Sequence, residues 1–141
     1  MTVLEQAEQK ALVTRCKMEG IEVIGIENSL QFPIKAVLDI VKPYLNDREL
    51  AMVKSRLGTL IATLTNKRYA QGLFRGAPDL FIPKYHTFIE MKRRDGGKAS
   101  PEQLEAQKML RKYGYTSEIC HGAAVGWSII QEQMEKMKNE L

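Results

Sequence analysis

The sequence has few of the residues that build disulfide frameworks, zinc sites and membrane spans. It holds two cysteines and two histidines (Cys16, Cys120, His86 and His121) and no C-x-x-C pair. This scarcity argues against a disulfide framework and a Cys/His zinc site, and we expect both thiols to be reduced in a cytoplasmic protein. No apolar run approaches the roughly 20 residues that cross a bilayer. The first residues also lack the basic and apolar blocks of a signal peptide, so we expect no membrane partner.

Composition and charge narrow the class of protein further. With 44% hydrophobic and 27% charged residues, the chain matches an average globular protein and not a disordered one. A length of 141 residues suits one domain covering 1–141. The formal net charge of +4 comes entirely from residues 92–112, where seven basic side chains face three acidic ones. Such a focus indicates either a polyanionic partner or a Lys-rich solvated helix face.

Periodicity and capping residues predict an alternation of helices and strands. The expected helices cover residues 3–19, two segments within 33–64, 101–113 and 123–139. Ser100, Pro101 and Gln103 are typical of a helix start, with the serine at the N-cap and the glutamine at the third position. The expected strands cover 21–26, 79–83, 87–92 and 115–120, and 65–78 is expected to be a loop. This order predicts an α/β fold with one mixed sheet covered by helices.

The residues with the clearest chemistry lie on the hairpin predicted over 79–92. Glu90 and Lys92 share one face of their strand, because side chains two residues apart point the same way. Asp79 begins the preceding strand and can lie close to Glu90 across a short hairpin. Two converging carboxylates repel each other unless a divalent cation lies between them, and oxygen ligands without His or Cys favour Mg²⁺ or Mn²⁺. The alternative is a turn aspartate beside an ordinary cross-strand Glu–Lys pair.

The surrounding sequence favours the metal-site interpretation. Gly76-Ala77-Pro78-Asp79, Phe88-Ile89-Glu90-Met91-Lys92 and Ser100-Pro101-Glu102-Gln103 follow one another in order. Together they resemble the virus-type replication-repair nuclease (VRR-NUC) domain of the PD-(D/E)XK nucleases, with Ala77 in place of the usual valine. The resemblance covers about residues 66–130 and, more loosely, the first helix. It implies a restriction-endonuclease-like core, with a helical insertion over residues 32–66 after the first strand.

The resemblance also implies a role for each residue of these motifs. Asp79 and Glu90 would bind the metal, and the backbone carbonyl of Met91 would add a ligand. Lys92 would be the catalytic lysine, able to stabilise negative charge on the phosphate. Gln103 matches the glutamine on the helix that faces the site, and it is equally a candidate for the capping-box partner of Ser100.

A first-helix acid belongs to the same implied ligand set. The family places a glutamate there, usually with Glu or Gln four residues later. Glu5 with Gln9 fits that spacing, which puts both side chains on one helix face. Glu8 is the competing candidate, and each of the two glutamates is also readable as a solvated helix residue.

Basic side chains around the hairpin are candidates for phosphate contacts, which position DNA without reading its sequence. Tyr69, Phe74 and Tyr85 are candidates for stacking on unpaired bases. The insertion over 32–66 is readable as a dimerisation element, a substrate wedge or ordinary packing. The proposed phosphate contacts are Lys67, Arg68, Arg75, Arg93, Arg94 and Lys98.

These observations predict a Mg²⁺- or Mn²⁺-dependent DNA endonuclease that hydrolyses phosphodiester bonds. The resemblance implies a small homodimeric enzyme that cuts branched DNA such as Holliday junctions, from a phage, prophage or bacterium. Within enzymes, the alternative is a nuclease acting on flaps or nicks. Outside enzymes, the alternatives are a catalytically inactive nucleic-acid-binding module and a plain interaction protein.

Overall fold

The computed structural model describes residues 2–27 and 32–140, which form an α/β arrangement of five α-helices and one four-stranded sheet. The chain divides into two compact units, Met1–Asn28 with Arg75–Leu141, and Ser29–Phe74. Within the described ranges, no helix has both the length and the apolar character needed to cross a membrane. The elements in order are α1 (Val3–Met18), β1 (Ile24–Gly25), α2 (Ile34–Val41), η1 (Lys42–Tyr44), α3 (Asp47–Ala70), β2 (Leu80–Ile82), η2 (Pro83–Tyr85), β3 (Thr87–Lys92), α4 (Pro101–Lys112), β4 (Thr116–His121) and α5 (Ala123–Asn139).

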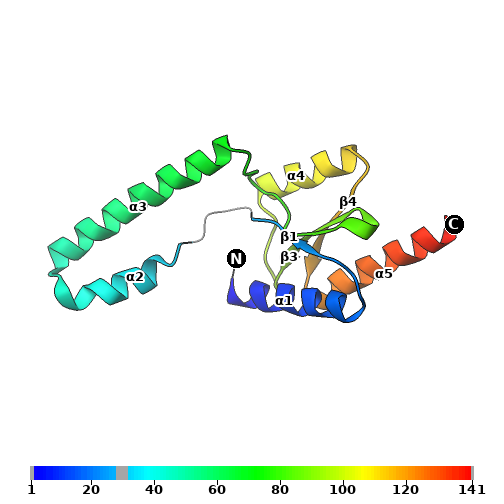
Figure 1. The fold of residues 1–141 in the computed structure, drawn as a ribbon, viewed down its shortest axis with the longest axis horizontal. Coiled ribbons are helices and arrows are strands. Elements are labelled where there is room, and N and C mark those ends of the chain that lie inside the picture. The colour runs from blue at the N-terminus through cyan, green and yellow to red at the C-terminus, as the bar shows by residue number, and fades with distance from the viewer. Residues whose placement is uncertain (1, 28–31, 141) are drawn as a thin grey trace. The chain divides into compact units, whose positions relative to one another are not determined.

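The first unit is a mixed sheet between two helical layers. The strand order is β1-β2-β3-β4, with antiparallel pairing from β1 to β3 and parallel pairing between β3 and β4. A parallel pair needs a crossover connection, and α4 supplies it. Helices α1 and α5 cover one face of the sheet, and α4 lies on the other (Figure 1). The predicted mixed α/β class is therefore confirmed.

The hydrophobic core lies between the sheet and the layer formed by α1 and α5. Alternate strand residues point into it, so Leu80, Ile82, Ile89 and Met91 are at most 1% exposed. Gly126 brings α5 close to α1, since a Cβ there would lie 2.7 Å from Leu12 Cδ2. Cys16 and Cys120 are free thiols in the same core, and every buried residue of the cluster belongs to the first unit.

Capping residues set several of the helix starts that the sequence predicts. Thr2 and Glu5 form a capping box at α1, and Ser100 and Gln103 form one at α4. The helices expected over 3–19, 101–113 and 123–139 match α1, α4 and α5 to within a residue at each end. Local patterning was therefore sufficient for these three helices.

Two predicted boundaries are wrong. Residues 65–70 belong to α3 and not to a loop, because the helix ends only at Gln71 and Gly72, which adopts a φ of 106°. The strand expected over 21–26 shrinks to Ile24–Gly25. The amide of Ile21 bonds back to the Cys16 carbonyl to close α1, which removes the start of that strand.

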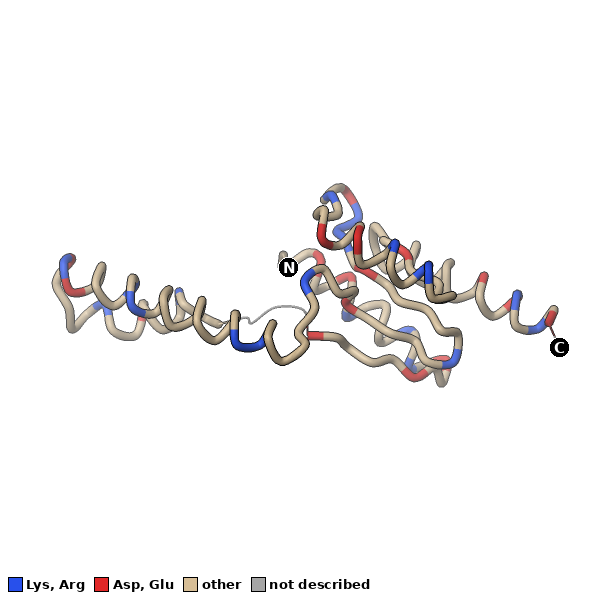
Figure 2. The backbone as a smooth tube through the Cα atoms, turned by 90° about the horizontal axis from the view of Figure 1, so that it is seen from above, with Lys and Arg blue, Asp and Glu red and all other residues tan. Residues whose placement is uncertain are grey.

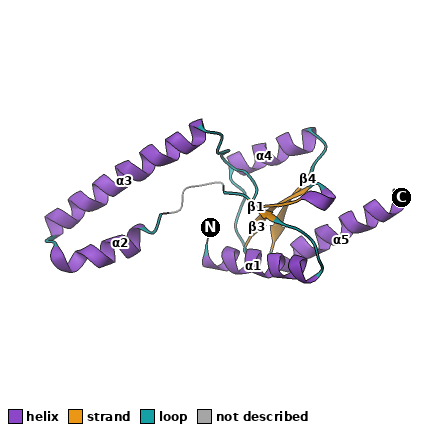
Figure 3. Ribbon diagram, in the orientation of Figure 1, coloured by secondary structure: helices purple, strands orange, loops and turns teal. Residues whose placement is uncertain are grey.

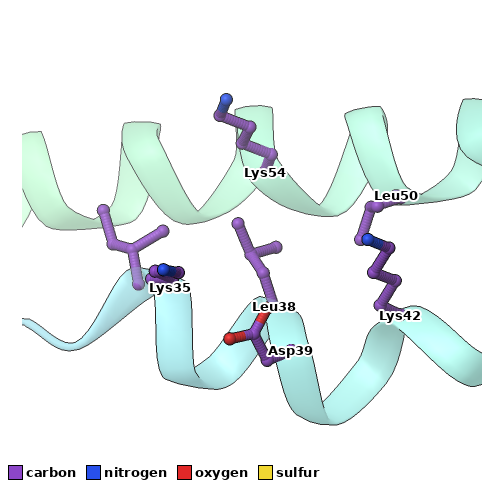
Figure 4. Close-up of a pocket in the computed structure, with 7 residues that line it drawn as sticks. Lys35, Leu38, Asp39, Lys42, Leu50 and Lys54 are labelled. Carbon is purple, nitrogen blue, oxygen red and sulfur yellow. The ribbon is translucent and has the colours of Figure 1, made fainter.

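The second unit is a helical hairpin of α2, η1 and α3 (Figure 3). None of its helical residues is fully buried. A shallow groove of about 450 Å³ runs between its two α-helices, with Ile34, Leu38 and Leu50 as its apolar lining (Figure 4). Acidic and basic positions occur in both units of the chain (Figure 2). The groove is rimmed by Lys35, Asp39, Lys42 and Lys54.

Candidate active site

The register of β2 and β3 sets Asp79 and Glu90 side by side. Leu80 pairs with Ile89, so the residues just outside this pair face each other on the opposite side of the sheet from the core. Asp79 Oδ2 accepts a hydrogen bond of 2.7 Å from the backbone amide of Met91. This bond anchors the aspartate against β3 and places two carboxylates at one point of the sheet.

Glu90 lies at the centre of a buried polar cluster. Its Oε1 accepts a 2.5 Å hydrogen bond from Gln103 Nε2 and lies 3.7 Å from Lys92 Nζ. Its Oε2 is buried and has no hydrogen-bond partner among the described residues. Asp79, Glu90 and Lys92 are only 4%, 6% and 8% exposed. The site therefore withdraws two carboxylates and one ammonium from water, which is unfavourable unless these groups are fully paired or bind a ligand.

Burial is the main cause of an unusual acid–base property of Glu90. Desolvation, followed by repulsion from Asp79, raises the pKa of Glu90 to about 8, against the opposing effect of Lys92. Glu5 adds a smaller repulsion in the same direction. A bound cation reverses this effect, because it favours the ionised carboxylate.

Gln103 fills both of the roles considered for it. Its Oε1 accepts from the Ser100 amide at 2.9 Å, which completes the capping box of α4. Its Nε2 donates to Glu90. The two ends of one amide thus join the start of α4 to the carboxylate on β3, because the side chain has both an acceptor and a donor.

Gly76 allows the loop before Asp79 to pack against the start of α4. The residue has a φ of 77°, in the left-handed region. A Cβ there would overlap the backbone C and O of Glu102 and lie 2.6 Å from the Gln103 amide nitrogen. A glycine is therefore required for Asp79 and Gln103 to converge on Glu90.

The structure separates the two glutamates of the first helix. Glu8 Oε2 accepts from the Ala123 amide at 2.7 Å, and its Oε1 lies 3.2 Å from Arg94 Nη2. Glu8 thus fastens α1 to the start of α5. Glu5 instead lies near Lys92 and the loop after β3, since a Cβ on Gly97 would lie 3.6 Å from both Glu5 Oε1 and Lys92 Cδ, and its charge contributes to the raised pKa of Glu90.

The donor atoms around Glu90 suit a hard divalent cation. Oxygen donors from two carboxylates share the site, and Glu90 Oε2 is a buried acceptor without a partner. Gln9, one helical turn after Glu5, has a second buried oxygen without a hydrogen bond in the described structure. No group of three or more His, Cys, Asp or Glu side chains within 2–27 and 32–140 forms a compact metal-binding cluster. The carboxylates of Asp79 and Glu90 are thus the residues that would hold Mg²⁺ or Mn²⁺. Met91 could contribute only its backbone, because its side chain is buried in the core.

The basic residues predicted to contact phosphates are divided between the two units of the chain. Arg93, Arg94 and Lys98 lie in the loop that leaves β3 directly after Lys92, and all three are exposed. His121 Nε2 lies 3.0 Å from the Gly97 carbonyl and holds this loop near the site. Arg75 opens the return of the chain to the first unit. Lys67 and Arg68 lie in the last turn of α3, in the second unit.

One feature of the site face was missed in the sequence. Phe81 and Phe88 stack with their ring centroids 4.4 Å apart, and Tyr115 packs edge-on against both. Alternation could have found this cluster, because Phe81 follows Asp79 by two residues and Phe88 precedes Glu90 by two. The cluster therefore shares the face of the carboxylates.

Fold and site together define an α/β protein with a buried carboxylate–lysine centre on its sheet. Comparisons with family models, curated proteins and solved structures find no match to this chain. The functional argument therefore depends on the geometry of the site and on the motifs described above.

Proposed function

We propose that this chain is a divalent-metal-dependent DNA endonuclease of the VRR-NUC type, built on a restriction-endonuclease-like core. The observation that carries the proposal is the convergence of Asp79, Glu90, Lys92 and Gln103 from three separate motifs at one buried point. The ion pair with Lys92 and the hydrogen bonds from Met91 and Gln103 offset the cost of this burial in part, and Glu90 Oε2 is a buried acceptor that they leave unused.

Each side chain has a distinct part in the proposed hydrolysis. Asp79 and Glu90 would hold Mg²⁺ or Mn²⁺, which when bound supplies Lewis-acid activation of a phosphodiester and of water. Gln103 Nε2 donates to Glu90 Oε1 and fixes the carboxylate, so that Glu90 Oε2 remains available to a ligand. Lys92 places its ammonium beside Glu90, where it stabilises negative charge that develops on the phosphate.

Branched DNA is the proposed substrate, and a homodimer the proposed active form. Both follow from the resemblance, because small stand-alone members of the family cut Holliday junctions as symmetric dimers. Two subunits place two sites on a two-fold axis, which suits a four-way junction. The exposed basic side chains of the loop after β3 would contact the phosphates beside the cut.

The first test is cleavage of a labelled four-way junction beside linear duplex, with Mg²⁺, Mn²⁺ or EDTA. We expect metal-dependent paired cuts by the wild type. We expect at least a 100-fold lower rate for Lys92→Met, which keeps the aliphatic stem but removes the charge. Cutting of flaps or nicks alone would keep the nuclease and discard junction resolution. DNA binding without cleavage under any metal would contradict the enzyme and favour a binding module.

A matched pair of variants tests the role of the first helix. Glu5→Gln preserves the capping box but removes a charge that contributes to the raised pKa of Glu90, so we expect lower cleavage at nearly unchanged stability. Glu8→Gln loses the ion pair with Arg94 and weakens the contact with α5, so we expect lower stability and retained cleavage. Melting temperatures and single-turnover rates separate the two effects. The reverse pattern would assign the catalytic role to Glu8.

A further inference from the structure

A second feature lies on the same sheet face as the carboxylates, beyond the aromatic cluster. A hollow of about 420 Å³ is bordered by Phe81, Pro83 and His86 and by the turn Tyr113-Gly114-Tyr115. Its volume lies within the range of ligand pockets, roughly 300 to 1,000 Å³. Tyr113 is 68% exposed and Tyr115 is 39% exposed, so their rings are accessible to a ligand.

The Tyr115 ring beside this hollow is packed against other rings of the sheet face. Tyr115 stands nearly perpendicular to Phe81 and Phe88, with interplanar angles of 76° and 77°. His86 lies 6.5 Å from Tyr115 between ring centroids. The turn that presents Tyr113 is closed by a bond of 3.1 Å from the Tyr115 amide to the Leu110 carbonyl, which ends α4. The Tyr115 ring is thus positioned by packing on the sheet, which reduces the ordering required when a flat ligand binds, and the backbone of Tyr113 is positioned by the turn that ends α4.

One lysine beside the hollow favours an anionic group on the ligand. Lys112 Nζ lies 5.7 Å from the centroid of the Tyr113 ring. Lys84 borders a different hollow, together with Tyr85 and residues of α5. An aromatic face with one lysine beside it matches the two parts of a nucleotide, a base that stacks and a phosphate that pairs with an ammonium group.

The position of the hollow relative to the carboxylates indicates its place on the substrate. Phe88 lies two residues before Glu90 on β3, a separation of about 7 Å along a strand. Phe81 stands at the same distance from Asp79 on β2. A DNA strand whose phosphate reaches Glu90 can therefore extend over the aromatic cluster. Duplex DNA keeps its bases stacked on one another, so the aromatic faces suit an unpaired base.

We propose that Tyr113, Tyr115 and His86 bind an unpaired nucleobase of the DNA strand that is cut, with Lys112 contacting its phosphate. The proposal deepens the nuclease function and depends on it for the identity of the substrate. Under this proposal, the enzyme would prefer branched DNA because the hollow binds unstacked bases next to the junction. This site differs in position from the basic loop after β3, to which the proposed function assigns phosphate contacts alone.

The test measures binding in EDTA, where cleavage is absent. A short dT strand containing 2-aminopurine and a fluorescent duplex are titrated with wild type, Tyr113→Ala, Tyr113→Phe and the control Tyr44→Ala. Tyr44 is 84% exposed and lies in the second unit. We expect Tyr113→Ala to weaken single-strand binding at least fivefold and to abolish quenching of 2-aminopurine, because one stacked base contributes about 1 to 3 kcal/mol. Tyr113→Phe and Tyr44→Ala should behave as the wild type, and duplex binding should change less than twofold.

Several outcomes would overturn the inference. Unchanged dT binding by Tyr113→Ala would exclude stacking at this hollow, as would an equal loss on single strand and duplex. Absence of dT binding by the wild type would leave the hollow to an apolar peptide, and the nucleobase assignment would then be wrong. The nuclease proposal is judged separately by metal-dependent cleavage with Lys92→Met. Absence of cleavage with a Tyr113-dependent loss of dT binding would keep a nucleobase site at the hollow and remove the cut strand as its source, whereas cleavage with unchanged dT binding would keep the nuclease and remove the base site.

Discussion

At Glu90, burial and charge act together against ionisation. The pKa of this carboxyl is raised to about 8, chiefly by desolvation and then by Asp79. Between pH 4.5 and about 8, the folded protein therefore keeps a proton on Glu90 that the unfolded chain has released, because the ordinary pKa of the carboxyl is 4.5. Stability contributed by the protonated form is complete below pH 4.5 and is lost as the pH rises through about 8. Metal binding and proton binding thus compete at this carboxylate.

Glu90→Gln tests this linkage in EDTA. The amide cannot ionise, so the variant should become more stable than the wild type as the pH rises, by on the order of 4 kcal/mol at pH 8. Below pH 4.5 the two proteins should differ little. Urea unfolding at pH 4.5, 6 and 8 measures the difference. A gap that is constant with pH would contradict the raised pKa, and Mg²⁺ should narrow the gap by stabilising only the wild type.

Single residues also mark the limit of prediction from the sequence. Asp79, Glu90 and Lys92 could be selected because strand alternation and the resemblance identify them without tertiary information. The Gln103 amide can accept one hydrogen bond and donate another, but whether it reaches both Ser100 and Glu90 depends on where α4 begins. The choice between Glu5 and Glu8 required the packing of α1 on α5, which no local pattern contains.

At the scale of elements, the loop before β2 and the start of α4 determine each other's position. The contact depends on Gly76, where a side chain would meet the backbone of Glu102. Gly76→Ala should lower the free energy of unfolding by about 2 to 4 kcal/mol, from the positive φ and from the overlap. It should also reduce cleavage, because displacement of α4 carries Gln103 away from Glu90. Thermal melts and single-turnover rates measure the two effects.

Gly58→Ala is the matched control for this prediction. Gly58 lies within α3, and a Cβ there meets nothing within 4 Å. Alanine favours a helix interior over glycine by about 1 kcal/mol, so this variant should be as stable as the wild type or more stable. Equal destabilisation by the two substitutions would show that the loss at Gly76 is a general effect of removing glycine.

The elements themselves were predictable to different degrees. Helices with strong caps, such as α4 with its Ser-Pro-x-Gln start, were predicted to within a residue. The end of α3 was not, because Thr65 and Asn66 are weak helix formers whose helix continues to Ala70. β1 was overestimated, because the length of a strand depends on its partner, and β2 is only three residues long. The local sequence of one strand does not determine which distant strand it pairs with or over what length.

At the scale of the molecule, the two units differ in how many residues each removes from contact with water. The core draws all of its buried residues from the first unit. The hairpin of α2 and α3 has no fully buried residue in its helices. The chain leaves the first unit after β1 and returns before β2, where the Ile26 amide bonds to the Asp79 carbonyl at 2.8 Å. Two residues of the first unit that flank the inserted segment are therefore joined directly.

Replacement of residues 29–74 by a short Gly-Ser linker tests the independence of the first unit. We expect a cooperative thermal transition with a midpoint no more than about 5 °C below that of the full chain, since the core is complete without the hairpin. Circular dichroism should show the loss of helix signal and an otherwise intact spectrum. Loss of cooperative unfolding would show that the first unit depends on the hairpin for its stability.

The hydrogen bond between Ile26 and Asp79 has a consequence for the order of folding. It joins residues separated by the whole of the hairpin, whereas β2 and β3 are joined by a short turn. Each doubling of the enclosed chain length adds about 0.6 kcal/mol to the entropic free-energy cost of loop closure. The pairing of β2 with β3 should therefore precede the pairing of β1 with β2. β1 is then the last strand to join and the first to open. In hydrogen exchange, the amide of Ile26 should lose protection before those of β3, and the shorter linker should slow that loss.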